Sequence, residues 1–192
     1  MPNNLDTPEN RFQVKKAIQL KMHADLKTAI AVYSYIDDKS HIAFKKAEKL
    51  KIIKYRIEDK AQKLGYSKAC QESIYDCKGQ CCTWHFPENL CFIDFFLMVC
   101  DLSKTKLLEL NAHLLNFQNN TYQCPILKKN GCFLDFDTRP LFCTNAYPCF
   151  IQDQYWQFLA VKKKEIQSIY FFLNKFLEPL INQAKKHLNQ YK

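Results

Sequence analysis

The sequence predicts a mainly α-helical protein in which a helical bundle surrounds an irregular, cysteine-rich module with a small β-hairpin. Three observations favour this fold class. Glycine occurs only 3 times in 192 residues, which disfavours a turn-rich β fold. Long runs rich in leucine, lysine, isoleucine and alanine lie towards both ends of the chain, whereas cysteines gather in its middle. A chain of this length is expected to fold as a single domain around one core.

Two helices are predicted in the first 65 residues, and we expect them to form an N-terminal helical hairpin. Thr7-Pro8-Glu9 offers a capping hydroxyl, a proline suited to the first helical position and an acid in the first turn. Apolar residues then recur at helical spacing as far as Ile36. Residues 37–40 interrupt the pattern, Ser40 is expected to cap the second helix, and Gly65 is expected to end it.

Residues 66–150 form the predicted cysteine-rich module, in which helical periodicity weakens and prolines and aromatic residues accumulate. Ser103 is expected to cap a helix that starts at Lys104 and ends near Phe117. The Asn-Gly step at residues 130–131 predicts a short β-hairpin, with one cysteine of the module near each of its ends.

A further helix is expected to begin near Pro140, capped by Asp137 or Thr138, which would place Cys143 about one turn inside it.

Residues 151–192 predict a long C-terminal helix, whose apolar set includes Trp156, Phe171 and Phe176. These aromatic residues fall at helical core spacing, so we expect them to be core residues. Pro179 is expected to kink or break this helix just before its own position.

The chain carries a formal net charge of +9, and most of it comes from lysines in the two terminal segments. Base recognition in nucleic acids favours bidentate arginine, so we interpret the lysines as a solvated helix surface and disfavour a nucleic-acid partner. The apolar run over residues 90–100 is too short to span a bilayer, and the first residues do not resemble a secretory signal. These features predict a cytoplasmic protein without a membrane partner, whose thiols stay reduced rather than forming disulfides.

Six thiols form the candidate site, because grouped thiolates in a reducing compartment are typical ligands of zinc and iron. Gly79 permits a sharp turn that would let the cysteines on either side of it converge on one ion. Six thiols exceed one tetrahedral site, so three arrangements stay open: a four-ligand site with spare cysteines, a dinuclear site, or an iron–sulfur cluster. The predicted metal ligands are Cys77, Cys81, Cys82, Cys124, Cys132 and Cys143.

The remaining cysteines have different interpretations. Cys91 and Cys100 lie in an apolar stretch, where a free cysteine behaves as a small hydrophobic residue, so both are predicted to be core residues. Cys70, His85 and Cys149 lie near the grouped thiols, and whether any of them completes a coordination shell stays open.

The order of these motifs resembles the bacterial YkgJ-type cysteine-cluster family of zinc- or iron-chelating domains. The resemblance covers about residues 70–150 and leaves the flanking helices outside it. It implies metal chelation by the six cysteines and does not choose between zinc and iron. The matching elements are Cys77-x3-Cys81-Cys82, Cys124-Pro125-Ile126-Leu127, Cys132 and Arg139-Pro140-Leu141-Phe142-Cys143.

The main hypothesis is therefore a cytosolic metal-binding protein that chelates zinc, or alternatively iron or an iron–sulfur cluster, through its cysteines. Arg139 would then offset thiolate charge, unless it pairs with a neighbouring aspartate. One alternative is an iron–sulfur or metal-dependent enzyme, for which His85, Asp135 and Asp137 are the available acid–base groups. Another is a zinc-stabilised module that binds nucleic acid or protein through its lysine-rich helices. Because GxSxG, GxGxxG, HExxH and phosphate-loop motifs are all missing, nothing in the sequence demands an enzyme.

Overall fold

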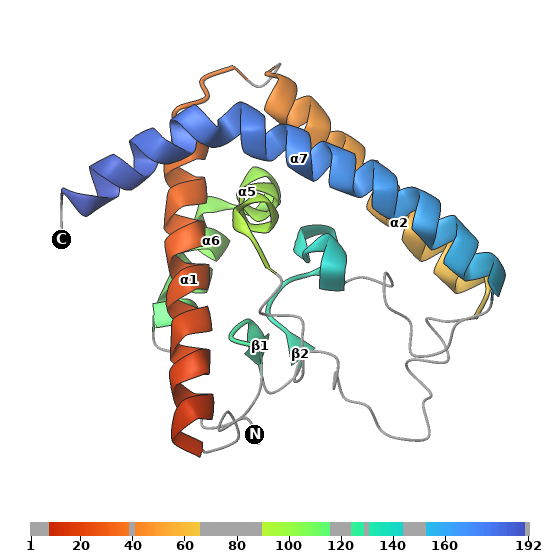
Figure 1. Ribbon diagram of the computed structural model, residues 1–192, viewed down its shortest axis with the longest axis horizontal. Helices are drawn as coiled ribbons and strands as arrows, with labels where there is room; N and C mark the ends of the chain where they lie inside the picture. The colour runs from red at the N-terminus through yellow and green to blue at the C-terminus, as the bar shows by residue number, and fades with distance from the viewer. Residues whose placement is uncertain are drawn as a thin grey trace, which may run out of the picture.

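The computed structural model of the protein describes residues 8–38, 41–65, 90–115, 124–128, 131–143 and 153–190. These residues are mainly helical, as predicted (Figure 1). They form the helices α1 (Pro8–Ser34), α2 (Ile42–Lys63), α5 (Phe92–Asp101), α6 (Lys104–Leu115) and α7 (Asp153–Asn189). They also form the strands β1 (Leu127–Lys128) and β2 (Gly131–Cys132), and the 3-10 turns η3 (Phe136–Thr138) and η4 (Leu141–Cys143).

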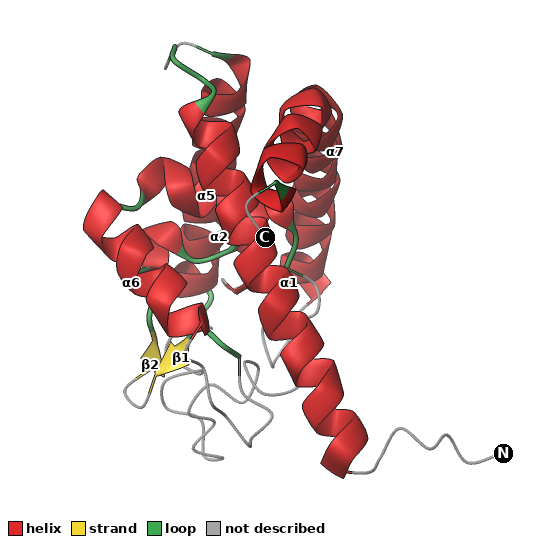
Figure 2. Cartoon of the chain, turned by 90° about the vertical axis from the view of Figure 1, so that its left-hand side faces the viewer, coloured by secondary structure: helices red, strands yellow, loops and turns green. Residues whose placement is uncertain are grey.

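The long helix α7 runs across the whole molecule and organises the other helices (Figure 1). Its N-terminal half packs antiparallel to α2, and its C-terminal half crosses α1. The short helix α5 lies in the angle between α1 and α2 and contacts α1, α2 and α7. Figure 2 shows α6 beside α1, with the strand pair β1–β2 beneath it.

Helices α1 and α2 diverge from the connection between them, rather than lying side by side as the predicted hairpin requires (Figure 1). The reason is α5, which the sequence analysis treated only as an apolar run. Seven of its ten residues are buried, so it takes the position against α1 that a hairpin partner would occupy. Because α5 covers the apolar stripe of α1, α2 buries its own stripe mainly against α7.

The ends of α1 and α2 follow the sequence signals with one exception. Helix α1 begins at Pro8, as predicted. Gly65 follows the end of α2 with a φ of +75°, a left-handed conformation that glycine adopts without strain. The predicted cap at Ser40 is wrong, because the N-cap of α2 is His41, whose Nδ1 accepts a hydrogen bond from the backbone N–H of Ala43 at 3.3 Å.

Ser103 caps α6 as expected, since its Oγ accepts a hydrogen bond from the backbone N–H of Lys106 at 3.3 Å. The helix ends at Leu115, and residues 116–123 lie outside the described part of the chain.

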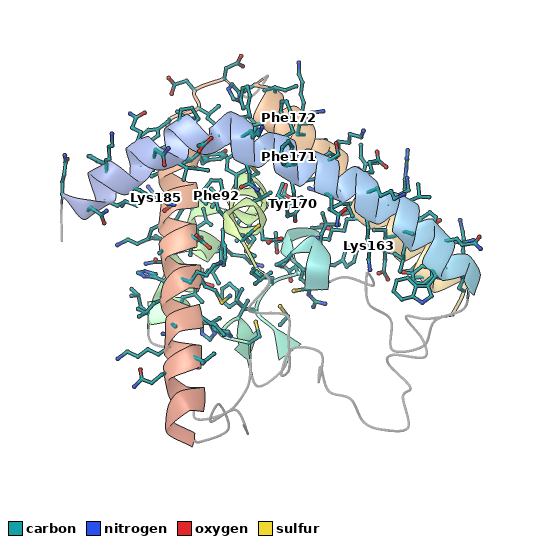
Figure 3. All side chains as sticks on the ribbon, in the orientation of Figure 1. Phe92, Lys163, Tyr170, Phe171, Phe172 and Lys185 are labelled. Atoms are coloured by element: carbon teal, nitrogen blue, oxygen red, sulfur yellow. The ribbon has the colours of Figure 1, made fainter. Side chains whose placement is uncertain are left out.

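Pro179 does not break α7, which continues to Asn189 and bends in its C-terminal part (Figure 1). The assignment of Trp156, Phe171 and Phe176 to the core is wrong, because these side chains are 44%, 63% and 40% exposed. Only a narrow stripe of α7 packs on the other helices, and Figure 3 shows the inward-facing Tyr170 and the outlying Phe172 on different sides of it. The buried stripe of α7 consists of Tyr155, Leu159, Ile169, Leu173, Leu177 and Ala184.

Candidate functional site

Of the six predicted metal ligands, the structure describes the three in the second half of the cysteine-rich module. These are Cys124, Cys132 and Cys143. The other three predicted ligands, and the three residues whose role stays open, lie outside the described residues: Cys77, Cys81, Cys82, Cys70, His85 and Cys149.

Cys124 and Cys132 belong to one small unit, the antiparallel strand pair β1–β2. Leu127 pairs with Cys132 in this ladder, and the N–H of Phe133 donates to the carbonyl oxygen of Ile126 at 2.9 Å. The pair stands where the sequence predicts a hairpin, and residues 129–130 between its strands lie outside the described residues. The ring of Phe133 stacks on His113 of α6, so the strand pair is anchored to the helices.

The sulfur atoms of Cys124 and Cys132 each accept a backbone hydrogen bond from the residue two positions further on. The donor to Cys124 is the N–H of Ile126 at 3.5 Å, and the donor to Cys132 is the N–H of Leu134 at 3.4 Å. Backbone N–H groups commonly donate hydrogen bonds to the sulfurs of metal-bound cysteines. They also tune thiolates that bind metals. These two sulfur environments therefore fit metal-ligating thiolates.

Cys143 lies in the 3-10 turn η4 and not, over the described residues, in the α-helix predicted from Pro140; residues 144–152 lie outside the described part of the chain. The turn η3 ends before Arg139, which has an extended backbone with φ −63° and ψ 142°. A residue before proline avoids the α-helical region, so Arg139 separates η3 from the turn that follows Pro140. The short turn η4 follows, in which the N–H of Cys143 donates to the carbonyl oxygen of Pro140 at 2.9 Å.

Arg139 ties the 3-10 turns to the strand pair, since its Nε donates to the carbonyl oxygen of Leu134 at 2.9 Å. The alternative pairing with a neighbouring aspartate is not what the described residues show. Asp135 forms its ion pair with Lys106 of α6 at 2.6 Å, and Asp137 accepts a hydrogen bond from the hydroxyl of Tyr55.

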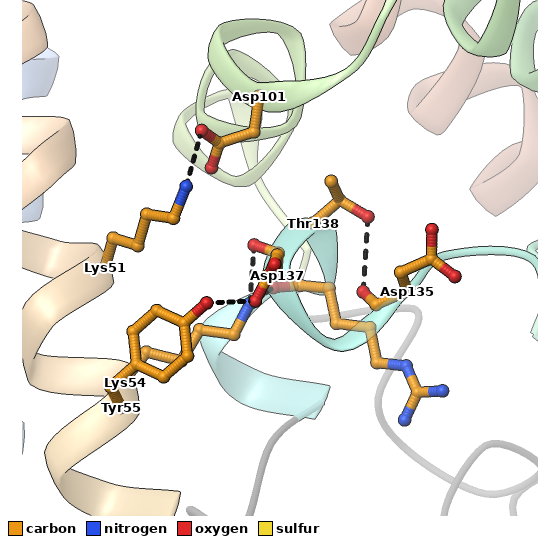
Figure 4. Close-up of polar contacts among 8 residues, drawn as sticks. Lys51, Lys54, Tyr55, Asp101, Asp135, Asp137 and Thr138 are labelled. Atoms are coloured by element: carbon orange, nitrogen blue, oxygen red, sulfur yellow. Dashed lines mark hydrogen bonds and ion pairs between the residues drawn. The ribbon is translucent and has the colours of Figure 1, made fainter.

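Lys54 of α2 is a buried lysine that the sequence analysis missed. It is 3% exposed, and its Nζ donates to the carbonyl oxygens of Asp137 at 2.8 Å and Arg139 at 2.9 Å (Figure 4). The same Nζ lies 4.8 Å from the centre of the Phe136 ring. Burial lowers the pKa of Lys54 to about 8, partly offset by Asp137. The sequence signal for its burial was a lysine, next to Ile53, at a position where the helical spacing of α2 predicts an apolar core residue.

Cys91 and Cys100 pack against the core at either end of α5, in line with their prediction as core residues. Burial raises the pKa of Cys91 to about 11 and the pKa of Cys100 to about 12, so both thiols stay protonated at neutral pH.

A second polar group that the sequence analysis missed lies at the start of α5. Asp94 is 4% exposed and accepts hydrogen bonds from the hydroxyl of Tyr170 at 2.8 Å and from the N–H of Cys91 at 2.9 Å. Burial raises the pKa of Asp94. Burial and Asp94 together raise the pKa of Tyr170, with smaller contributions from Cys91 and Cys143. Cys143 therefore lies within electrostatic range of this group.

Within the described residues, no three histidine, cysteine or acidic side chains gather as a group that could hold a metal ion. Three of the six predicted thiols lie outside these residues. No helix in the described part of the chain is long and apolar enough to cross a membrane. Comparisons with protein-family models, with curated proteins and with solved structures gave no match.

Proposed function

We propose that the protein binds zinc, or alternatively iron or an iron–sulfur cluster, through a cysteine cluster. The proposal rests mainly on the two N–H···S hydrogen bonds to Cys124 and Cys132. Backbone donors to sulfur offset the negative charge that thiolate ligands bring together around a metal. The proposed ligands are Cys77, Cys81, Cys82, Cys124, Cys132 and Cys143.

The segment that carries the last three of these cysteines is fixed to the helices from several sides. Lys106 of α6 pairs with Asp135, and Lys54 of α2 binds the backbone on both sides of Thr138. A thiolate group built on a fixed backbone loses less conformational freedom when it binds a metal. This half of the module would therefore act as a platform that the cysteines of the first half complete.

A bound zinc or iron would hold the two halves of the module together and would couple folding to metal binding and to pH, because thiols must lose protons to bind. The proposal includes membership of the YkgJ-type family and a cytoplasmic location, where thiols stay reduced. No observation favours the enzyme alternative. Asp135 and Asp137, two of its three acid–base candidates, are already engaged by Lys106 and Tyr55.

The test compares three cysteine variants purified side by side. We expect Cys132→Ser and Cys143→Ser to lower the metal content per chain and the free energy of unfolding together, since each removes a proposed ligand. Cys100→Ser is the matched control, because it changes a thiol outside the proposed ligand set and should keep the metal. Full metal content in both ligand variants, measured by mass spectrometry of the acidified protein, would overturn the proposal.

A further inference from the structure

A cavity of about 390 Å³ lies between α2, α5 and the turns η3 and η4, and none of the proposed thiol ligands that the structure describes, Cys124, Cys132 and Cys143, lines it. Its walls come from four parts of the fold. Phe44, Lys45 and Lys51 project from α2, Leu97 from α5, Tyr33 from the end of α1, and Arg139 from the segment after η3. The volume falls within the range of pockets that hold small organic molecules.

Helix α2 packs mainly on α7, and α5 packs mainly on α1, which leaves a space between α2 and α5. Two contacts bridge this space. The ion pair between Lys51 and Asp101, at 3.0 Å, fastens the end of α5 to α2. Lys54 fastens the turn η3 to α2 through the carbonyl oxygens of Asp137 and Arg139 (Figure 4). These contacts fix the positions of the cavity walls relative to one another, so the cavity is already formed in the described structure.

Four basic and three acidic side chains line this space, and the basic ones are less fully paired. Asp101 is paired with Lys51, and Asp137 accepts from the hydroxyl of Tyr55. Lys54 donates its hydrogen bonds to backbone carbonyls, which carry no net charge to balance its ammonium group. Within the described residues, neither Lys45 nor Arg139 has an acidic partner in an ion pair, and the third acid lining the cavity is the exposed Glu48.

We propose that this cavity binds a small organic anion, with one carboxylate or phosphate group on an apolar body. The anionic group would lie against Lys45, while Arg139 adds positive charge to the same cavity from another element. The apolar body would pack on Tyr33, Phe44 and Leu97. The described cysteine ligands of the proposed metal cluster do not line this cavity, and the proposal does not depend on the metal.

The test titrates the full-length protein, as purified with its metal, with three probes of similar shape. Benzoate carries a carboxylate, phenyl phosphate carries a phosphate, and benzamide is neutral. We expect saturable movement of the amide resonances of Leu97 and Thr138 with at least one of the two anions, and about tenfold weaker binding of benzamide, since one charged contact contributes about that factor. A preference between the two anions identifies the class of acid that the cavity takes.

A matched pair of variants places the binding in the cavity. Lys45→Gln should weaken binding of the preferred anion by about five- to tenfold, whereas Lys185→Gln, on the distant end of α7, should leave it unchanged (Figure 3). Three results would overturn the inference: no saturable binding at low millimolar probe, equal binding of benzamide and the anions, or unchanged affinity in Lys45→Gln. Metal content is a separate readout that Lys45→Gln should not alter, so failure of this inference is distinguishable from failure of the proposed metal cluster.

Discussion

The Nζ atom of Lys54 lies 2.9 Å from the carbonyl oxygen of Arg139 and donates a hydrogen bond to it. This bond joins the middle of α2 to a residue 85 positions later in the chain, in the segment that leads into Cys143. A second bond from the same Nζ to the carbonyl of Asp137 makes the connection two-pronged. The buried amine thus positions the segment between the strand pair and η4, and Lys54 also lines the cavity between α2 and α5.

Replacing Lys54 with methionine keeps the apolar stem and removes both hydrogen bonds. We expect Lys54→Met to lower the free energy of unfolding by about 2 kcal/mol, because two backbone carbonyls lose their donor. Urea unfolding measures this change, and Lys164→Met is the control because it lies on the exposed side of α7. Equal stability of the two variants would mean that the Lys54 hydrogen bonds contribute nothing to the fold.

Lys54 also makes stability depend on pH in a defined direction. Its pKa is about 8 in the folded protein and 10.5 in an unperturbed lysine, so between these values the unfolded chain holds one more proton than the folded chain. The stability linked to Lys54 is therefore complete above about pH 10.5 and is lost as pH falls through about 8. The charged groups around the amine are Asp137, Asp101, Lys51 and Arg139.

We expect the wild type to gain about 3.5 kcal/mol over Lys54→Met as the pH rises through this window, at about 1.4 kcal/mol for each of the roughly 2.5 units between the two pKa values. The measurement is urea unfolding of both proteins at several pH values, with the difference taken at each pH so that other titrating groups cancel. A difference that stays constant across the window would contradict the assigned pKa.

Tyr170→Phe removes the hydroxyl that donates to the buried carboxylate of Asp94. We expect a loss of about 1 to 2 kcal/mol in the free energy of unfolding at neutral pH, because the buried Asp94 side chain loses a hydrogen-bond donor. Burial raises the pKa of Asp94, so its protonation favours the folded state, and the loss should shrink as the pH falls and the carboxylate becomes neutral.

The control for this prediction is Tyr35→Phe, because Tyr35 is only partly buried and its hydroxyl has no hydrogen-bond partner within the described residues. Urea unfolding of both variants at neutral and mildly acidic pH compares the loss of a hydrogen-bonded hydroxyl with the loss of one that has no such bond. Equal losses for Tyr170→Phe and Tyr35→Phe would show that Asp94 does not depend on the hydroxyl.

Two neighbouring positions of α7 test which side of this helix is buried. Leu173 is fully buried, so Leu173→Ala should cost about 3 kcal/mol. Phe171 is 63% exposed and its ring makes a cation–π contact with Lys175, so Phe171→Ala should cost less than about 1 kcal/mol. Thermal unfolding of the two variants measures the contrast, and a larger loss at Phe171 would reverse the assigned orientation of α7.

The sequence was most informative where structure depends on neighbours in the chain. The start of α1 at Pro8, the end of α2 at Gly65 and the cap of α6 by Ser103 follow from local rules for helix ends. The mainly helical fold class follows from composition in the same way. At Pro140, where the sequence predicts a helix start, the described residues form the short 3-10 turn η4, because the local rules for helix starts do not distinguish an α-helical from a 3-10 turn.

Features that depend on tertiary packing could not be predicted in this way. Helical spacing alone does not reveal that α5 separates α1 from α2, or that only one stripe of α7 is covered. It therefore assigned Phe171 to the core and gave no role to Lys54. For the candidate site, the sequence selects residue types and spacing, and the hydrogen bonds to the sulfurs of Cys124 and Cys132 come only with the folded backbone.

The central claim is that the cysteine cluster binds a metal. The most direct measurement is metal analysis together with an absorption spectrum, on protein purified without oxygen and without added metal. The account predicts a stoichiometric metal: zinc with a colourless protein, or iron, with acid-labile sulfide and a brown chromophore if it is held as a cluster. Protein that contains no metal after both oxygen-free and aerobic purification, yet unfolds cooperatively, would contradict it.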